Sequence, residues 1–316
     1  MTVPLRSLPG PVLVTGGTGF LGREVLPRLV ANGWDSHALT SRLDPPPIPG
    51  VTWHHANLLE GEGAAGVIGQ VRPRALMHLA WYVAPGQWAM SLENLEWVEA
   101  SMRLVRAFKN RGGQRMVVVG SGLEYDWSYG YCSEIRTPCT PHTIYGTAKH
   151  ALRLLLEPYA RHEGLSFAWP RIFFLYGPHE HPARLVASVV RSLLKREPAR
   201  CSHGRQIRDY LYVGDAADAC VRVLESEVEG PINVASGQPI TLRALATRAG
   251  ELIGRPELIE FGAIPAAATD APFVVADVSR LSTQLAWSPS FSLDSGLERT
   301  VAWWQRQIDE LTLARS

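Results

Sequence analysis

The chain has 316 residues, of which 46% are hydrophobic and 19% charged, proportions typical of an ordinary globular protein. Its formal net charge is +1 and no lysine- or arginine-rich run occurs, which argues against nucleic acid or an anionic membrane surface as a partner. No apolar stretch reaches the roughly 18 residues needed to cross a bilayer, and residues 1–10 lack the apolar core of a signal peptide. Because the four cysteines also lack metal-ligand spacing, we expect a cytoplasmic protein with free thiols and no metal site.

The first predicted element is a short apolar strand at residues 11–14, followed by a glycine-rich turn within VLVTGGTGFLG. Gly16, Gly19 and Gly22 fall at three-residue spacing. In a dinucleotide-binding turn the first glycine allows the sharp bend, the second lets a ligand approach the backbone, and the third lets the next helix pack on the strand. The helix then directs free N–H groups and the positive end of its dipole toward the ligand. This pattern predicts a site for the pyrophosphate of a dinucleotide rather than a merely structural turn.

Short apolar runs and helical patterns alternate through the first half of the chain. We predict strands at residues 36–40, 51–53, 75–79 and 116–119, and helices at residues 62–70 and 92–110. Such alternation is typical of an α/β protein with a doubly wound, parallel, Rossmann-type sheet. Ligands of these sheets bind outside the carboxyl ends of the strands.

The second half of the chain has a different pattern, with clustered prolines, a predicted helix at residues 183–196 and short mixed elements. We interpret residues 1–177 as a dinucleotide-binding domain, to which the chain returns around residues 209–236. Residues 178–208 and 237–316 are then a smaller α+β substrate-binding region.

Three further motifs follow the glycine turn in a fixed order. Ser121 stands in VVVGSGLEY, Tyr145 and Lys149 stand in YGTAK, and Arg208 stands in GRQIRDYLYV. With PRIFFLYGP, INVASG and LAWSP further along, these motifs resemble the extended short-chain dehydrogenase/reductase family, specifically its nucleotide-sugar epimerases, dehydratases and ketoreductases. The resemblance runs nearly end to end and implies the same Rossmann-type fold. It also implies a homodimer, because relatives often pair through the two long helices that flank the catalytic tyrosine.

The YGTAK motif carries the predicted proton chemistry. Tyr145 and Lys149 are four residues apart, so their side chains share one face of a helix. An ammonium beside a phenol favours the phenolate, so we expect the pKa of Tyr145 to fall below its usual value of about 10 and the residue to exchange protons near neutral pH. The resemblance implies that Lys149 also binds the nicotinamide ribose and that Ser121 holds the substrate carbonyl oxygen.

The end of the second predicted strand bears on the choice of cofactor. NAD enzymes of this type usually carry an acid there, about 20 residues after the glycines, for the ribose hydroxyls. Here Ser41 and Arg42 follow Thr40, and the guanidinium of Arg42 suits the 2′-phosphate of NADP. We therefore predict NADP, with an exposed loop arginine as the alternative interpretation. Further residues are expected around the cofactor: Phe20, Leu21, Asn57, Leu58, Leu79 and Ala80.

The predicted partner is a nucleotide-activated sugar. In relatives the arginine of the RD[FY] motif binds the sugar nucleotide's diphosphate, which assigns this role to Arg208. Arg184 and Gln206 are helpers by position, or else ordinary surface residues.

Aromatic side chains and a histidine are further candidates for the substrate site. Trp81 and Trp88 follow the fourth predicted strand, where such rings pack either against a sugar or into the core. His179 follows a Gly-Pro pair, where a substrate-binding or exposed histidine is favoured over a proton donor.

Departures from the family pattern indicate the reaction. The 4,6-dehydratases carry an Asp-Glu pair directly after the active-site hydroxyl, but Gly122 and Leu123 follow Ser121, so dehydration is not expected. Leu123 also stands where enzymes that combine epimerisation with reduction place a cysteine. Phe174 replaces the asparagine that many C4 epimerases and dehydratases carry in R-x-F-N, which disfavours an epimerase.

Together with NADP, these departures predict an NADPH-dependent reductase of a nucleotide-linked 4-keto-6-deoxyhexose. Hydride would pass from the nicotinamide to the C4 carbonyl while Tyr145 supplies the proton and Ser121 polarises the oxygen. The alternative is a nucleotide-sugar C4 epimerase. A non-catalytic dinucleotide sensor on the same fold is less favoured, because such a protein is expected to lack the Tyr-Lys pair.

Overall fold

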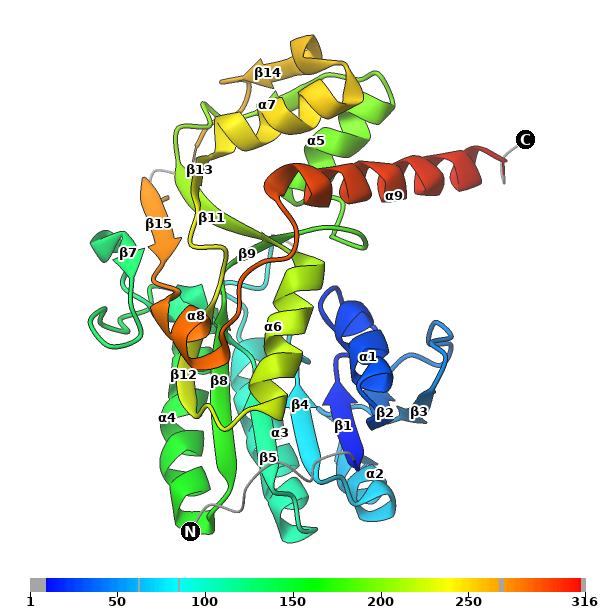
Figure 1. The fold of residues 1–316 in the computed structure, drawn as a ribbon, viewed down its shortest axis with the longest axis vertical. Coiled ribbons are helices and arrows are strands. Elements are labelled where there is room, and N and C mark those ends of the chain that lie inside the picture. Colours follow the sequence, from blue (N-terminus) through cyan, green and yellow to red (C-terminus); the bar gives the residue numbers. More distant parts are fainter. Residues whose placement is uncertain (1–9, 62, 85, 267–269, 314–316) are drawn as a thin grey trace.

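A parallel sheet of eight strands forms the main layer of the computed structural model, which describes residues 10–61, 63–84, 86–266 and 270–313. Its strands are β1 (Pro11–Thr15), β2 (Asp35–Thr40), β3 (Val51–His55), β4 (Ala75–His78), β5 (Arg115–Val118), β6 (Gly120–Ser121), β8 (Ser166–Ile172) and β12 (Gly230–Val234). They lie in the order β12-β8-β5-β4-β1-β2-β3, with β6 beside β8, and all pairs are parallel. The carboxyl ends of these strands therefore share one edge, which points upward in Figure 1.

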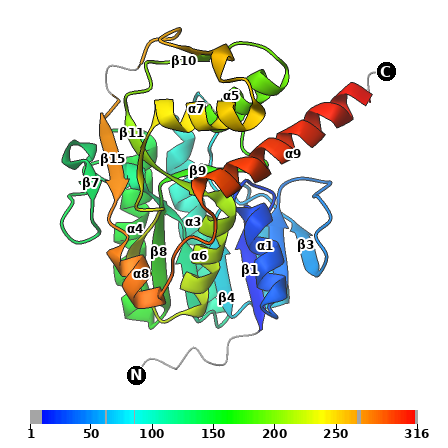
Figure 2. The same cartoon turned by 45° about the horizontal axis from the view of Figure 1, so that its top comes forward.

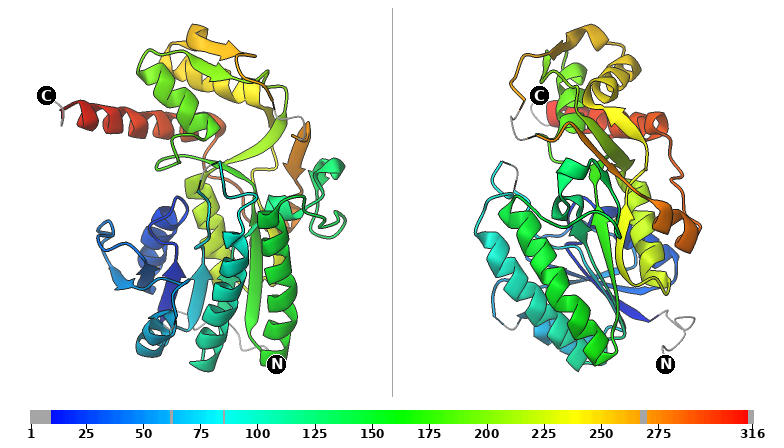
Figure 3. Two further views of the ribbon diagram at one scale, coloured as in Figure 1. Left: turned by 180° about the vertical axis from the view of Figure 1, so that it is seen from behind. Right: turned by 90° about the vertical axis from the view of Figure 1, so that its left-hand side faces the viewer.

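Helices cover both faces of this sheet, as the right-hand view of Figure 3 shows. Five helices pack on these faces: α1 (Gly22–Ala31), α2 (Gly63–Val71), α3 (Glu93–Asn110), α4 (Ile144–Glu163) and α6 (Val213–Glu225). α2, α3 and α4 pack on one face, and α1 and α6 pack together on the other. On each face, strands and helices pack together in a separate hydrophobic cluster, so the central strands are apolar on both sides.

A smaller second layer lies beyond the carboxyl edge of the main sheet (Figures 1 and 2). Its sheet contains β7 (Tyr131–Cys132), β9 (Phe174–Tyr176), β11 (Ile207–Tyr212), β13 (Pro239–Thr241) and β15 (Phe273–Ala276). This layer also contains α5 (Leu185–Leu194), β10 (Ala199–Cys201), α7 (Leu242–Ile253), β14 (Ile259–Phe261) and α9 (Leu293–Leu313), whereas α8 (Ser279–Leu285) packs beside β12 of the main sheet. α5, α7 and α9 pack on one another, and one residue, Phe173, separates β8 of the main sheet from β9 of the second.

The predicted α/β fold with a parallel Rossmann-type sheet is confirmed. Every strand and helix predicted for the first half of the chain is present, with ends shifted by at most two residues. The second sheet was not predicted, because strands as short as β7 and β9 are too brief to show a hydrophobic period.

No helix in the described part of the chain is long and apolar enough to cross a membrane. Residues 1–9, on which the expectation of no signal peptide rests, lie outside the described residues.

Arg115, at the start of β5, is completely buried although it is charged. Its guanidinium donates to the carbonyl oxygens of Val223 (2.5 Å), Val228 (2.8 Å) and Leu224 (3.3 Å), and to Ser166 Oγ (2.8 Å). Carbonyls at a helix C-terminus lack partners inside the helix and carry the negative end of its dipole. Arg115 therefore stabilises the end of α6 and ties it to the main sheet.

Replacing this guanidinium should destabilise the fold. We expect Arg115→Met to lower the free energy of unfolding by about 2–4 kcal/mol, because several buried carbonyls lose a charged donor. Urea unfolding measures the change. Arg222→Met is the matched control, since Arg222 is exposed on α6 and pairs with the partly exposed Asp218, and it should cost less than about 1 kcal/mol. Equal losses for the two variants would contradict the role given to Arg115.

Candidate active site

The glycine turn between β1 and α1 packs directly on the residues that follow β4. Gly16 has a positive φ of 71°, and a Cβ there would lie 2.7 Å from the backbone nitrogen of Ala80. A Cβ on Gly22 would lie 2.2 Å from the carbonyl oxygen of Gly16. Cβ atoms do not approach backbone this closely, so both positions require glycine.

The N-terminus of α1 is left without a side-chain cap by Leu21, the residue before the helix. The first N–H groups of a helix have no partners within it, and with the helix dipole they favour an anion. The turn and helix start therefore fit a pyrophosphate. The other residues predicted around the cofactor lie in this turn or just after β2, β3 and β4 at the same edge: Phe20, Leu21, Ser41, Arg42, Asn57, Leu58, Leu79 and Ala80.

A second arginine lies near Arg42 beside the turn. Burial, and then the positive charge of Arg42, lower the pKa of Arg23. Arg23 Nε donates to the carbonyl oxygen of Thr18 in the turn (3.0 Å), and Arg42 is exposed just after β2. Two guanidinium groups, and no carboxylate from residues 40–42, therefore stand at the tip of this strand.

Ser121, Tyr145 and Lys149 meet at the carboxyl edge beside β5. The Thr143 side chain caps α4 by accepting from the backbone N–H of Gly146 (3.0 Å), so the helix begins just before Tyr145. The side chain of Ser121 interacts with the phenol of Tyr145. Lys149 is only 2% exposed, and its Nζ lies 6.0 Å from the centroid of the Tyr145 ring. The structure thus brings together the three residues that the sequence singled out for catalysis.

The expected lowering of the Tyr145 pKa by Lys149 is wrong. Burial raises the pKa of Tyr145 to about 12, against the opposing effect of the Ser121 side chain. The ammonium of Lys149 instead donates to the carbonyl oxygen of Val119 (2.8 Å) and lies over the ring of Trp81. Burial lowers the pKa of Lys149 to about 7.

Two tryptophans near Tyr145 have different surroundings. Trp81 is 9% exposed, donates from Nε1 to Asn94 Oδ1 (2.8 Å), and carries Lys149 Nζ 3.8 Å from its ring centroid. Trp81 therefore supports Lys149 from within the core, although the sequence had also suggested contact with a sugar. Trp88 packs edge-to-face on Tyr145 with 4.8 Å between ring centroids, and the guanidinium of Arg184 lies 5.6 Å from its centroid.

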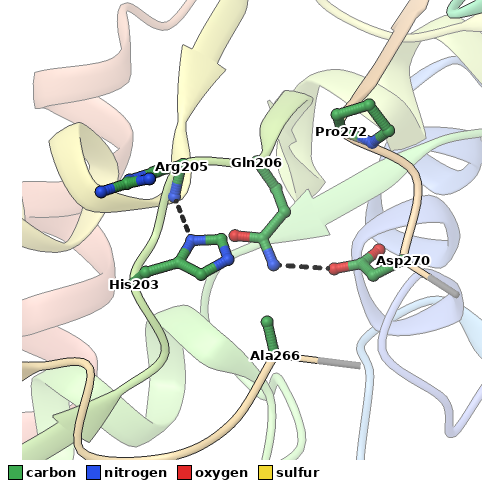
Figure 4. Close-up of a pocket in the computed structure, with 6 residues that line it drawn as sticks. All are labelled: His203, Arg205, Gln206, Ala266, Asp270 and Pro272. Atoms are coloured by element: carbon green, nitrogen blue, oxygen red, sulfur yellow. Dashed lines mark hydrogen bonds between the residues drawn. The ribbon is translucent and has the colours of Figure 1, made fainter. Parts of the chain in front are cut away.

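Arg208, on β11, is 3% exposed. Figure 4 shows Gln206 and Asp270, which lie beside it. Arg208 Nη2 donates to the carboxylate of Asp270, which also accepts from Gln206 Nε2 (3.0 Å). The rings of Phe174 and Trp127 lie 5.5 and 5.8 Å from its guanidinium. A hollow of about 160 Å³ adjoins this cluster, lined by His203, Arg205, Gln206, Ala266, Asp270 and Pro272.

The loop after β9 adds a buried acid and a strained histidine. Glu180 is 4% exposed, its Oε2 has no hydrogen-bond partner, and burial raises its pKa to about 8 against the opposing charge of Arg184. His179 has a positive φ of 67°, and its ring packs 4.6 Å from that of Trp303 on α9. Burial lowers the pKa of His179, so the ring is neutral at neutral pH.

Sequence reasoning missed three acids of this site: Glu124, Glu180 and Asp270. Glu124 stands three residues after Ser121, but its partner Arg171 is 47 residues further on. No group of three or more potential metal ligands occurs among the residues that the structure describes, and all four cysteines are free.

Comparison with known proteins identifies the family of this chain. The NAD dependent epimerase/dehydratase family matches residues 12–235, and the chain belongs to it. The match confirms the resemblance seen in the sequence and makes the protein an enzyme that uses a nicotinamide dinucleotide.

Among curated proteins, the chain is similar to UDP-glucuronic acid decarboxylase 1 of Arabidopsis thaliana, with 25% identity over 315 residues, 94% of this chain and 70% of the relative. It is 27% identical over 243 residues to UDP-glucuronate 4-epimerase of Thermodesulfobacterium geofontis, covering 74% of this chain and 73% of the relative. Among solved structures, MoeE5 in complex with UDP-glucuronic acid and NAD superposes with a TM-score of 0.81 at 27% identity, covering 94% of this chain and all of MoeE5.

The close packing of Gly22 against Gly16 should be required for tight dinucleotide binding. We expect Gly22→Ala to weaken binding of the dinucleotide at least about tenfold, because the new Cβ displaces the backbone that faces the pyrophosphate. Fluorescence titration with both NAD and NADP measures this. In the control Gly66→Ala, the added methyl group meets nothing within 4 Å on α2, so affinity should stay unchanged and stability should rise slightly. Unaltered affinity in Gly22→Ala would place the cofactor elsewhere.

Proposed function

We propose that the protein is a C4 epimerase of a nucleotide sugar, which oxidises the C4 hydroxyl and reduces it again on the other face. One observation carries this proposal: Ser121 interacts with the phenol of Tyr145, and Lys149 lies beside that ring, at the edge of the sheet near the dinucleotide turn. The bound dinucleotide supplies the acceptor and donor of hydride. Tyr145 takes the hydroxyl proton and returns it, while Ser121 holds the oxygen.

The surroundings of this pair argue against a dehydratase. Glu124 is the carboxylate nearest along the chain to Ser121, and it is fully buried and paired with Arg171. It is therefore unavailable to abstract a proton from the neighbouring sugar carbon, as a dehydratase requires. This supports oxidation and reduction of one carbinol centre.

We assign the nucleotide end of the substrate to Arg208 and Gln206. Both side chains are buried and donate to Asp270, so they form one polar cluster. Paired guanidinium and amide donors suit the diphosphate of a sugar nucleotide. The relatives named above act on or bind UDP compounds, which supports a uridine nucleotide.

Arg184 points to a carboxylate on the sugar. It forms no ion pair with an acid in the described ranges, and its charge lowers the pKa of both Tyr145 and Glu180, so it lies within electrostatic range of both. A guanidinium near the reacting carbon suits the C6 carboxylate of a hexuronic acid. We therefore propose UDP-glucuronic acid as the first substrate to test, ahead of UDP-glucose.

The balance of cofactor separates an epimerase from a reductase. We expect the protein with bound dinucleotide to interconvert the two C4 epimers of the UDP-sugar without net change in absorbance at 340 nm, because the hydride is returned. Chromatography of the nucleotide sugars measures the products. Tyr145→Phe should bind dinucleotide normally and lose turnover by about 10²–10⁴-fold, since only the transferable proton is removed. Stoichiometric consumption of reduced cofactor by a 4-keto sugar would overturn the epimerase.

A reductase of a nucleotide-linked 4-keto-6-deoxyhexose remains the second candidate, because the pair Arg23 and Arg42 favours NADP, an exchangeable cofactor. If Arg42 binds the 2′-phosphate, Arg42→Asp should weaken NADPH binding by about 1–3 kcal/mol and leave NADH almost unchanged. Arg306→Asp, an equal change of charge on exposed α9, is the control and should alter neither affinity. Equal affinity of the unmodified protein for both cofactors would contradict the assignment.

A further inference from the structure

Two side chains of opposite charge bind the backbone between β5 and the active-site hydroxyl of Ser121. Lys149 Nζ donates to the carbonyl oxygen of Val119 (2.8 Å), and Glu124 Oε1 accepts from the backbone N–H of Ser121 (2.8 Å). Only Gly120 lies between the two bonded peptides. The ammonium and the carboxylate therefore act on one short stretch of backbone.

The site of Glu124 is built into the fold. Glu124 is 0% exposed, and its Oε1 also accepts from Trp169 Nε1 (2.8 Å). A Cβ on Gly120 would lie 2.4 Å from Glu124 Oε1 and 2.1 Å from Trp169 Nε1, so only glycine leaves room for the carboxylate there. Glu124 Oε2 accepts from Arg171 Nε (3.0 Å), so the buried carboxylate is paired with an opposite charge.

Lys149 has few other charged neighbours. His78, on β4, feels the charge of Lys149, and burial with this charge lowers the pKa of His78 to about 3, so the ring is neutral. Tyr145, on the same helix, is protonated at neutral pH, and Trp81 presents only its ring. Burial has the larger effect on Lys149 and lowers its pKa to about 7. The charge of Glu124 opposes burial and raises this pKa.

We propose that Glu124 is a positioning residue of this active site: its carboxylate fixes the backbone of Ser121 and favours the ammonium form of the Lys149 side chain. A neutral amine at Lys149 would lose its strong bond to Val119 and its attraction to the ring of Trp81. It would also be a weaker donor toward the ribose that the family resemblance assigns to it. The inference rests on the proposed roles of Ser121, Tyr145 and Lys149.

The chain allows a direct measurement of the Lys149 charge, because it contains only three lysines, Lys109, Lys149 and Lys195. Protein labelled with ¹³C at lysine Cε gives three side-chain signals whose shifts report protonation as pH rises. Lys109→Arg and Lys195→Arg assign them. This titration needs no turnover and no bound dinucleotide.

Glu124→Gln keeps an acceptor for Ser121 and Trp169 but removes the charge. We expect the midpoint of the Lys149 titration to fall by about 1–3 pH units from its wild-type value, as for a lost opposite charge close by. The alkaline limb of the kcat profile should move to lower pH with it, since the ammonium is then lost at lower pH. Trp169→Phe is the matched control: it removes a donor to the same oxygen, keeps the charge, and should leave the midpoint at or above the wild-type value.

The unpaired Arg171 in Glu124→Gln is expected to reduce stability. Glu124→Gln/Arg171→Met therefore serves as a second variant in which no buried charge is left alone, and it too should lower the Lys149 midpoint. A midpoint equal to wild type in whichever of these variants folds would overturn the inference, even if the protein proves to be an epimerase. A lowered midpoint in a protein without epimerase activity would leave the charge effect standing and refute only the proposed function.

Discussion

The ion pair between Glu124 and Arg171 is the interaction on which the active site and its connection to the second sheet depend. Both side chains are buried, so each charge needs the other and a full set of hydrogen bonds. Arg171 supplies these by donating to Tyr125 Oη (2.8 Å) and Cys139 Sγ (3.1 Å). Tyr125 in turn donates to Asn233 Oδ1 (2.8 Å) on β12. A partly satisfied network would be worse than an apolar core, so its completeness fixes these strands in one arrangement.

The same network reaches the second sheet. Asn233 Nδ2 donates to the carbonyl oxygens of Cys132 (2.9 Å) on β7 and Asp277 (3.0 Å) just after β15. Nearby, Asp209 accepts from the backbone N–H groups of Ser236, Gly237 and Ala276. Adjacent residues of a strand point to opposite sides. In the RDY motif, Arg208 is therefore free to face the substrate end, while Asp209 joins β11 to its neighbours.

Local patterns predicted the parts of the molecule that depend on neighbouring residues. The glycine turn, the alternation of strands and helices and the Tyr145–Lys149 spacing can each be seen in a short stretch of sequence. The pKa of Tyr145 was predicted wrongly because burial, which no local pattern reports, outweighs the charge four residues away. Glu124 was missed for a related reason: it pairs with Arg171 on β8, across a distance in sequence that only the folded sheet closes. Asp270 likewise meets Arg208 only through the register of β11 and β15.

The choice of lysine at position 149 follows from the number of donors the site needs. Three of the 31 basic residues counted as Lys and Arg are lysines, so an arginine here would be the ordinary choice for this chain. A guanidinium is planar and brings five N–H donors that must all be satisfied in a space where a single carbonyl accepts. The ammonium brings three: one is used by Val119, and the face of Trp81 stabilises the charge without needing a lone pair. A compact cation thus keeps an N–H donor for a ligand beside Tyr145. The charge of the Glu124 carboxylate stabilises this cation in its buried site.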